Sequence, residues 1–339
     1  ENHAIYCLAH EIEGHPGAVF YHLMDKQQFP LKLKEQKHRS KMYVDLANQV
    51  KKNGGYLEIE KPIMTESFIQ AALSDIDFMG IANNHMLYDK YLPEGKRITR
   101  TDLNNDYPTG EKGYCLFTFD LYYLYLNSGF KIMPTAGSAS HPIANPVGYN
   151  RIYAQLDGKM DSTNWFKTVK SGNTFVTNGP MLILTANDKP MGSTITVENN
   201  VTLNFTIYSQ TPIENVQLIK NGKVIKDFNQ VELNNNEALF GFDLKMENSS
   251  WIAARCFEKQ TDDNVRFAHT SPIFINVENK QFRMNDDALE WFISQTNQLI
   301  SEAKENSVMD KTEQRETIDL YEQAIDVFNK KMQKKYIQF

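Results

Sequence analysis

The sequence predicts a layered α/β domain, followed by a small β-sandwich and a C-terminal helical hairpin. Three observations along the 339 residues support this order. Residues 1–180 alternate short apolar strands with amphipathic helices, which is typical of an α/β domain. Residues 181–280 change to short strands with a period of two, and residues 281–339 carry two amphipathic helical patterns.

The first domain divides into apolar strand segments and helices with a period near 3.6. We expect strands over Ala4–Leu8, Ala18–Leu23, Tyr56–Ile59, Ile76–Ala82, Ile132–Ala136 and Arg151–Leu156. We expect helices over Tyr43–Lys52, Ser67–Leu73, Phe117–Asn127 and Asn164–Lys170. Gly54-Gly55 ends the first helix and Gly172 the last, as glycine commonly does. Residues 90–113 are rich in Pro, Gly, Asn and Asp without a clear period, so they read as a loop.

The second domain shows alternating strands and one clear hairpin signal. Val201, Leu203, Phe205 and Ile207 keep a strict period of two. Asn221-Gly222 lies between two apolar runs and predicts a type I′ turn. Further strands are expected over the residues from 238 to 244, Ile252–Cys256 and Ile273–Val277. Five to seven such strands in about a hundred residues indicate an immunoglobulin-like sandwich.

The last sixty residues predict two helices that pack against each other. Asn285 is placed to cap the first helix, and Asp310 precedes the second. The apolar faces consist of Leu289, Phe292, Ile293, Leu299 and Ile300 on the first helix, and Leu320, Tyr321, Ala324, Ile325 and Phe328 on the second. We therefore expect a helical hairpin docked on the body of the protein.

Composition limits the classes of partner. The formal net charge is −6, so no overall positive field favours nucleic acid as a partner. No apolar run reaches the roughly 18 residues of a membrane span. The three cysteines, Cys7, Cys115 and Cys256, have no metal-ligand spacing and an odd count. A periplasmic or secreted location is expected if the host is bacterial, and the oligomeric state is left open.

Polar clusters follow three of the predicted strands. The first is His10-Glu11-Ile12-Glu13-Gly14-His15, whose imidazoles and carboxylates are ligands that divalent metals accept. The second is Asn83-Asn84-His85, and the third runs from Ser138 to His141 with Asn150 and Arg151 beyond it. Functional groups of α/β proteins gather at the carboxyl ends of strands, so these clusters predict one shared cleft.

Each cluster also has an ordinary structural explanation. The first is compatible with a polar loop of exposed charges, and the second with a loop histidine held by hydrogen bonds. The Ser- and Gly-rich third cluster is compatible with a simple turn. No nucleophile elbow, Walker loop or dinucleotide fingerprint is present in the sequence.

A series of collinear segments carries a resemblance to a known family. The matching pieces are His10-Glu11-Ile12-Glu13, Glu60-Lys61-Pro62, Asp77 to His85, Phe119-Asp120-Leu121-Tyr122-Tyr123, Ser138-Ala139-Ser140, Asn145 to Arg151, Trp165 to Pro180, and His269-Thr270-Ser271-Pro272-Ile273. Together they resemble the PHP-like metal-dependent hydrolases, in the carbaryl-hydrolase-like (CehA/McbA) branch. The likeness covers nearly the whole chain, including the helical tail.

The resemblance implies a distorted PHP-type (β/α) barrel with metal at the carboxyl ends of its strands. Residues 1–180 would be the C-terminal part of that barrel, and metal-bound water would hydrolyse an ester, carbamate or phosphoester. Zinc, manganese or iron would be the cofactor. Glu11 matches the family's bridging carboxylate and His141 the histidine closing its Gly-Ser-Asp-Ala-His motif, with His15 and His85 as further candidate ligands. The cleft would be lined by His10, Lys61, Asn84, Ser138, Asn150 and Arg151.

Three departures from the family pattern bear on activity. The motif's aspartate is Ala139, Lys61 precedes Pro62 where many PHP enzymes have a metal-binding histidine, and the opening His-x-His strand is absent. An ammonium pointing into the site would repel a cation. We therefore expect Lys61 to form an ion pair with Glu11, and the chain to bind metal poorly and hydrolyse nothing.

Two classes of function remain open at the level of sequence. The chain is either a metal-dependent hydrolase whose complete protein has further N-terminal ligands, or a non-catalytic descendant, a pseudoenzyme. The second would bind a small molecule or a glycan in the old cleft. A His-x-His strand upstream of Glu1 would favour the enzyme.

Overall fold

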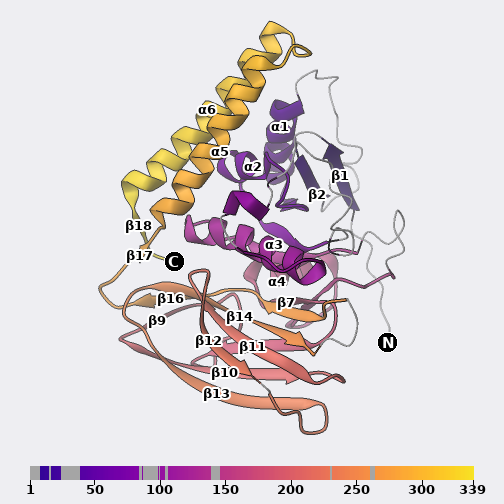
Figure 1. The fold of residues 1–339 in the computed structure, drawn as a ribbon, viewed down its shortest axis with the longest axis vertical. Helices are drawn as coiled ribbons and strands as arrows, with labels where there is room; N and C mark the ends of the chain where they lie inside the picture. The colour runs from indigo at the N-terminus through magenta and orange to yellow at the C-terminus, as the bar shows by residue number, and fades with distance from the viewer. Residues whose placement is uncertain are drawn as a thin grey trace.

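The computed structural model describes residues 8–14, 17–23, 39–83, 86, 98, 100–103, 106–138, 146–229, 231–259 and 264–339. They form three parts, seen in Figure 1 from the upper left to the bottom. The helical tail lies along one side of an α/β unit, and both lie above a β-unit made of two sheets. These names are kept below.

The α/β unit is built on a five-stranded sheet in the order β1-β2-β3-β4-β5. Its strands are β1 (Leu8–Gly14), β2 (Gly17–Leu23), β3 (Tyr56–Ile59), β4 (Phe78–Ala82) and β5 (Met133–Ala136). β2 pairs antiparallel with both β1 and β3, whereas β3, β4 and β5 are parallel. β1 therefore runs in the same direction as β3, β4 and β5. Over the described residues β1 and β5 are edges, so the sheet is open and not a closed barrel.

Helices cover both faces of this sheet. They are α1 (Arg39–Lys52), α2 (Ser67–Leu73), the short 3₁₀ helix η4 (Arg100–Leu103), α3 (Glu111–Asn127) and α4 (Ser162–Ser171). On one face the Tyr21 hydroxyl donates to the carbonyl of Tyr43 in α1, at 3.1 Å. On the other face the ring of Phe166 in α4 stacks on Tyr56, with centroids 5.0 Å apart. Alternation along β3 places Tyr56 and Leu57 on opposite faces, where Leu57 is fully buried and Tyr56 partly buried.

The β-unit contains an eight-stranded sheet and a three-stranded sheet. The first follows β12-β11-β14-β15-β7-β6, with β16 also paired to β14 and β9 paired to β16, and the second is β13-β10-β8. The strands are β6 (Arg151–Ala154), β7 (Thr174–Thr177), β8 (Met181–Ala186), β9 (Thr194–Val197), β10 (Asn200–Tyr208), β11 (Ile213–Lys220), β12 (Lys223–Asn229), β13 (Glu237–Lys245), β14 (Ser250–Glu258), β15 (Phe267–Thr270) and β16 (Ile273–Val277).

The two sheets of the β-unit share one apolar core. Leu184 and Leu203 from the small sheet and Leu218 and Ala254 from the large sheet belong to it, all fully buried. The period of two predicted for β10 arises because alternate side chains enter this core. The predicted hairpin is confirmed, since β11 and β12 pair antiparallel across Asn221-Gly222, with φ of 48° and 82°.

The tail is a pair of long helices, as predicted. α5 (Asp286–Glu305) is capped by the Asn285 side chain and α6 (Lys311–Lys334) by that of Asp310. The short strands β17 (Phe282–Arg283) and β18 (Tyr336–Ile337) pair at its base. The tail docks on the α/β unit, where the Tyr321 hydroxyl donates to Glu66 at 2.6 Å. No helix in the described ranges is both long and apolar enough to cross a membrane.

Several sequence predictions differ from the structure. α3 begins at Glu111 and not at Phe117, so the expected loop over residues 90–113 includes its first turn and also the 3₁₀ helix η4. The predicted strand Ala4–Leu8 meets the described residues only at Leu8, and β1 continues through His10-Glu11-Ile12-Glu13 to Gly14. That polar run is therefore strand and not a loop, because pairing with β2 satisfies its backbone. The predicted strand Arg151–Leu156, assigned to the first domain, pairs as β6 with β7 in the large sheet of the β-unit.

Candidate functional site

The carboxyl ends of β3, β4 and β5 meet at one edge of the sheet, as parallel strands require. The residues that follow the three strands are Glu60-Lys61, Asn83 and Gly137-Ser138. We call these five residues the carboxyl edge. β1 runs the same way, so its last residue, Gly14, also lies at this end of the sheet. The cleft predicted from the sequence would lie at this edge, and it stays a prediction.

Lys61 is a basic side chain that the fold buries. It is 3% exposed, and its ammonium lies 3.1 Å from Oε2 of Glu60. Its carbonyl accepts hydrogen bonds from the Ser67 hydroxyl at 3.0 Å and the Met64 amide at 3.1 Å, in the turn that leads into α2. A buried ammonium needs a carboxylate beside it, and Glu60 supplies one. The predicted pair with Glu11 stays a prediction, because the Glu11 side chain lies outside the described structure.

Asn150 joins the ends of β4 and β5. Its side-chain amide donates to the carbonyls of Asn83 at 3.2 Å and Gly137 at 3.3 Å. The Ser138 hydroxyl donates to the backbone carbonyl of Asn150 at 3.0 Å and accepts from the backbone amide of Asn150 at 3.1 Å. Asn150 is 3% exposed. These two predicted cleft residues therefore hold the backbone of the edge together.

Tyr149 and Arg151 flank this joint. The Tyr149 hydroxyl lies 3.3 Å from Glu111 and accepts a hydrogen bond of 2.7 Å from Arg266. Burial, with the nearby Glu111 carboxylate, raises the pKa of Tyr149 to about 12. Arg151 donates to the carbonyl of Gly148 at 2.9 Å and lies over the Tyr153 ring. These described contacts hold Arg151 to its own loop and do not join it to Lys61.

A second polar group lies on the sheet face that α4 covers. His22 Nε2 is 2.8 Å from Oε2 of Glu58, and the Thr135 hydroxyl donates to Oε1 of the same carboxylate. The side chains of His22 and Glu58 are only 14% and 13% exposed. The carboxylate thus fixes the orientation of the imidazole, an arrangement that serves either a structural pair or a general base.

Gly80 makes room for this group. It lies in β4, between Glu58 of β3 and Thr135 of β5, and pairs directly with Thr135. A Cβ at Gly80 would overlap the carbonyl oxygen of Glu60. The missing side chain therefore lets the backbones of β3 and β4 approach closely beside this group.

Aromatic rings close over the imidazole. The ring of Phe166 lies 5.1 Å from that of His22, Phe20 lies 5.9 Å away and Phe78 lies 6.2 Å away. Sequence reasoning missed His22 and Glu58. The sequence does show that each of these polar residues interrupts an apolar strand. That the two side chains meet follows only from the register of β2 against β3.

The candidate metal ligands are only partly within the described structure. Glu11 and His10 belong to β1 by their backbone, and Glu11 pairs with Phe20, which pairs with Glu58. Glu11 thus occupies the same row of the sheet as Glu58, two strands away. The other candidate ligands, His15, His85 and His141, lie outside the described residues, as does the predicted cleft residue Asn84.

A metal does not fit the side chains that are described. No group of three or more His, Cys, Asp or Glu in that part of the chain could hold a metal ion. At the carboxyl edge the Glu60 carboxylate faces the Lys61 ammonium, which competes with a cation for it. Among the described residues of this edge, Glu60 and Lys61 form an ion pair with each other.

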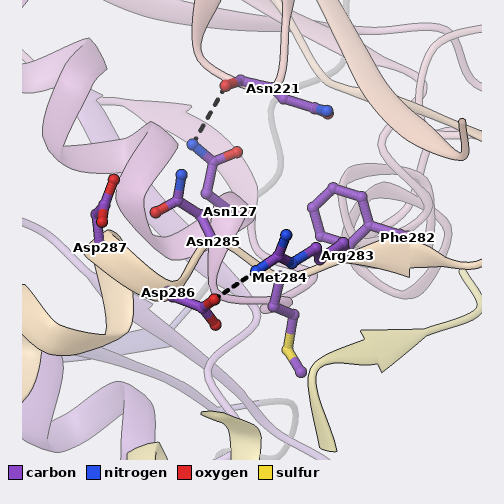
Figure 2. Close-up of a pocket in the computed structure, with 8 residues that line it drawn as sticks. All are labelled: Asn127, Asn221, Phe282, Arg283, Met284, Asn285, Asp286 and Asp287. Atoms are coloured by element: carbon purple, nitrogen blue, oxygen red, sulfur yellow. Dashed lines mark hydrogen bonds and ion pairs between the residues drawn. The ribbon is translucent and has the colours of Figure 1, made fainter.

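Another hollow, of about 300 Å³, lies where the three parts meet (Figure 2). Asn127, at the end of α3, donates to the carbonyl of Asn221 in the β11–β12 turn at 3.3 Å. Its side-chain oxygen accepts from the Trp251 indole at 2.9 Å, and its carbonyl accepts from the Asn285 amide at 2.9 Å. Arg283 and Asp286 form an ion pair of 2.7 Å on its wall. This hollow is a structural junction between the three parts.

Comparisons with known proteins give little further information. No protein-family model and no curated protein matches the sequence. One similar solved structure is a lytic polysaccharide monooxygenase from Jonesia denitrificans, 11% identical, with a TM-score of 0.20. The match covers 45% of this chain and 92% of that one. A TM-score this low supports no conclusion about fold or function.

Proposed function

We propose that this chain is a ligand-binding descendant of the PHP-like hydrolases that binds a small polar molecule or glycan at the carboxyl edge without metal. The observation that carries the proposal is the buried Lys61–Glu60 ion pair, 3.1 Å long, at the end of β3. The resemblance expects a metal-binding histidine at the position of Lys61. An ammonium there disfavours a cation and favours hydrogen-bond acceptors on a ligand.

The neighbouring polar groups support the same reading. Asn150 and Ser138 hold the backbone ends of β4 and β5, so this stretch of the edge is rigid. A rigid, pre-organised edge suits binding, because little conformational entropy is lost when a ligand arrives. The carboxyl end of a parallel sheet is also where α/β proteins most often bind their ligands.

A second candidate function is hydrolysis, favoured by the group His22, Glu58 and Thr135. A carboxylate that orients an imidazole is a common arrangement for a general base. Glu11, which matches the family's metal-bridging carboxylate, lies in the same sheet row as Glu58. In this case metal would be held by Glu11 and His141, with His15 and His85 as further ligands.

The finer fold assignment belongs to the same proposal. We propose that the five-stranded sheet is the C-terminal part of a PHP-type barrel, supported by its three parallel strands. We also propose that the β-unit is an immunoglobulin-like sandwich, supported by two sheets around one core. An experimental structure that closes the sheet into a barrel, or one that leaves it open, decides the first point.

Binding and turnover distinguish the two functions. Thermal-shift screening against oligosaccharides and small polar compounds should find a ligand that stabilises the protein, and Lys61→Met should lose that effect. Lys52→Met, at an exposed position on α1, is the matched control. Hydrolysis of 4-nitrophenyl acetate, a naphthyl carbamate or bis(4-nitrophenyl) phosphate with added zinc or manganese should stay at the background rate. Turnover that disappears in both His22→Gln and Glu58→Gln would instead establish the hydrolase.

A further inference from the structure

A groove of about 880 Å³ lies at the opposite end of the five-stranded sheet from the carboxyl edge. Ile76, just before β4, and Ile132, just before β5, form part of its floor. Phe274 of β16 and Ile337 of β18 bring the β-unit and the helical tail to its walls. Its volume is in the range of small-molecule sites, and such sites favour the junctions between structural units.

Three lysines line the groove: Lys131, Lys170 and Lys334. We call it the lysine groove. The Lys131 ammonium lies 5.0 Å from the centre of the Phe274 ring and 5.6 Å from that of Phe339. Both rings hold the ammonium by cation–π attraction while leaving its charge uncompensated.

One carboxylate, that of Asp75, lines the groove, and both it and the neighbouring Asp77 are engaged with other cations. Asp77 is 2.6 Å from Lys170 and 2.8 Å from Lys51, and Asp75 is 3.0 Å from Lys51. Within the described ranges no carboxylate pairs with Lys131 or Lys334. The groove therefore holds two cations that lack a counter-charge.

Two hydroxyl-bearing residues, Ser171 and Thr194, also line the groove. The Ser171 hydroxyl donates to the Thr168 carbonyl at 2.8 Å and keeps its oxygen as an acceptor. Thr194 belongs to β9, so the β-unit adds a polar side chain to the groove.

We propose that the lysine groove is a second binding site, for a small phosphorylated molecule. Ammonium groups bind phosphate as point charges, and hydroxyls add hydrogen bonds to its oxygens. Lys131 and Lys334 neutralise the anion. The proposal is independent of the function proposed for the carboxyl edge, which lies at the other end of the strands.

The test is calorimetric titration of the whole protein with pyrophosphate at low salt. Binding should occur and should weaken as NaCl is added, because the groove lysines are solvent-accessible. The double variant Lys131→Gln/Lys334→Gln should bind at least about tenfold more weakly, the loss expected for charge-assisted hydrogen bonds. Lys330→Gln, an exposed lysine on α6 outside the groove, should bind as the wild type does.

Three outcomes would overturn the proposal. They are no binding of pyrophosphate at millimolar concentration, equal affinity in the double variant and in Lys330→Gln, or citrate binding as tightly as pyrophosphate. Melting temperatures of both variants near that of the wild type show that any loss of affinity is local.

Discussion

At the scale of single residues, burial between the α/β unit and the β-unit favours the neutral form of His269. His269 of β15 is fully buried. Its Nδ1 donates to the Thr270 carbonyl at 2.7 Å, so in the neutral ring Nε2 accepts from the Tyr123 hydroxyl of α3, also at 2.7 Å. Burial, with a smaller effect of Arg255, lowers the pKa of His269 to about 3.

The lowered pKa of His269 predicts that the protein loses stability in acid. The unfolded chain takes up a proton near the ordinary pKa of 6.5, whereas the folded protein takes it up only near 3. Between these values the unfolded state binds more protons, so the free energy of unfolding falls as the pH falls. The loss is at most about 1.4 kcal/mol per pH unit.

The measurement is urea unfolding at several pH values between 7 and 4, for the wild type and for His269→Gln. The variant should lose stability less steeply with falling pH, because it lacks the titrating ring. Equal slopes for the two proteins would show that His269 is not held neutral.

Sequence alone identified some residues of the candidate site and not others. Ser138, Asn150 and Lys61 stood out because they sit in recognisable polar segments after strands. His22 and Glu58 did not, because their contact depends on the register of β2 against β3 and on Gly80 between β3 and β5. The register follows from packing of the whole sheet, which a local pattern does not contain.

At the scale of elements, α4 closes the sheet face that carries His22 and Glu58. The Asp161 side chain accepts from the Asn164 amide at 2.8 Å and caps the helix, and Gly172 ends it in the left-handed conformation. Asp161→Ala should therefore lower the free energy of unfolding by about 1 kcal/mol.

Asp157→Ala is the matched control for this cap. Asp157 is exposed and is tied to α4 only through its carbonyl, which the substitution keeps. Chemical denaturation of the two variants should show a loss for Asp161→Ala alone. An equal loss in both would mean that the cap does not stabilise α4.

Most elements were predictable because their signals are local. Period two in β10, Asn221-Gly222 in the hairpin and the caps of α5 and α6 each lie within a few residues. The sheet to which β6 belongs was not predictable, because its partner β7 comes twenty residues later and its neighbours in the β-unit later still. Such membership is decided by long-range pairing.

At the scale of the whole molecule, one asparagine links all three parts. Asn127 of α3 contacts Asn221 and Trp251 of the β-unit through its side chain and the start of α5 through its carbonyl (Figure 2). Asn127→Ala removes the acceptor of the buried Trp251 indole. This should cost about 1–3 kcal/mol of unfolding free energy.

Thermal and urea unfolding check this expectation, with Asn329→Ala on an exposed position of α6 as control. The control should stay within about 0.5 kcal/mol of the wild type, as surface substitutions usually do. If Asn127→Ala is as stable as the control, the junction does not hold the three parts together.

We propose that the Lys61–Glu60 ion pair lies at the carboxyl edge where PHP-like hydrolases would bind their metal. The most direct test is elemental mass spectrometry of the purified protein after incubation with zinc or manganese and exhaustive dialysis, alongside Lys61→Met and Glu11→Gln. We predict substoichiometric metal in the wild type and no further loss in Glu11→Gln. One tightly bound metal per chain in the wild type, lost in Glu11→Gln, would contradict the account and establish the metal-dependent hydrolase.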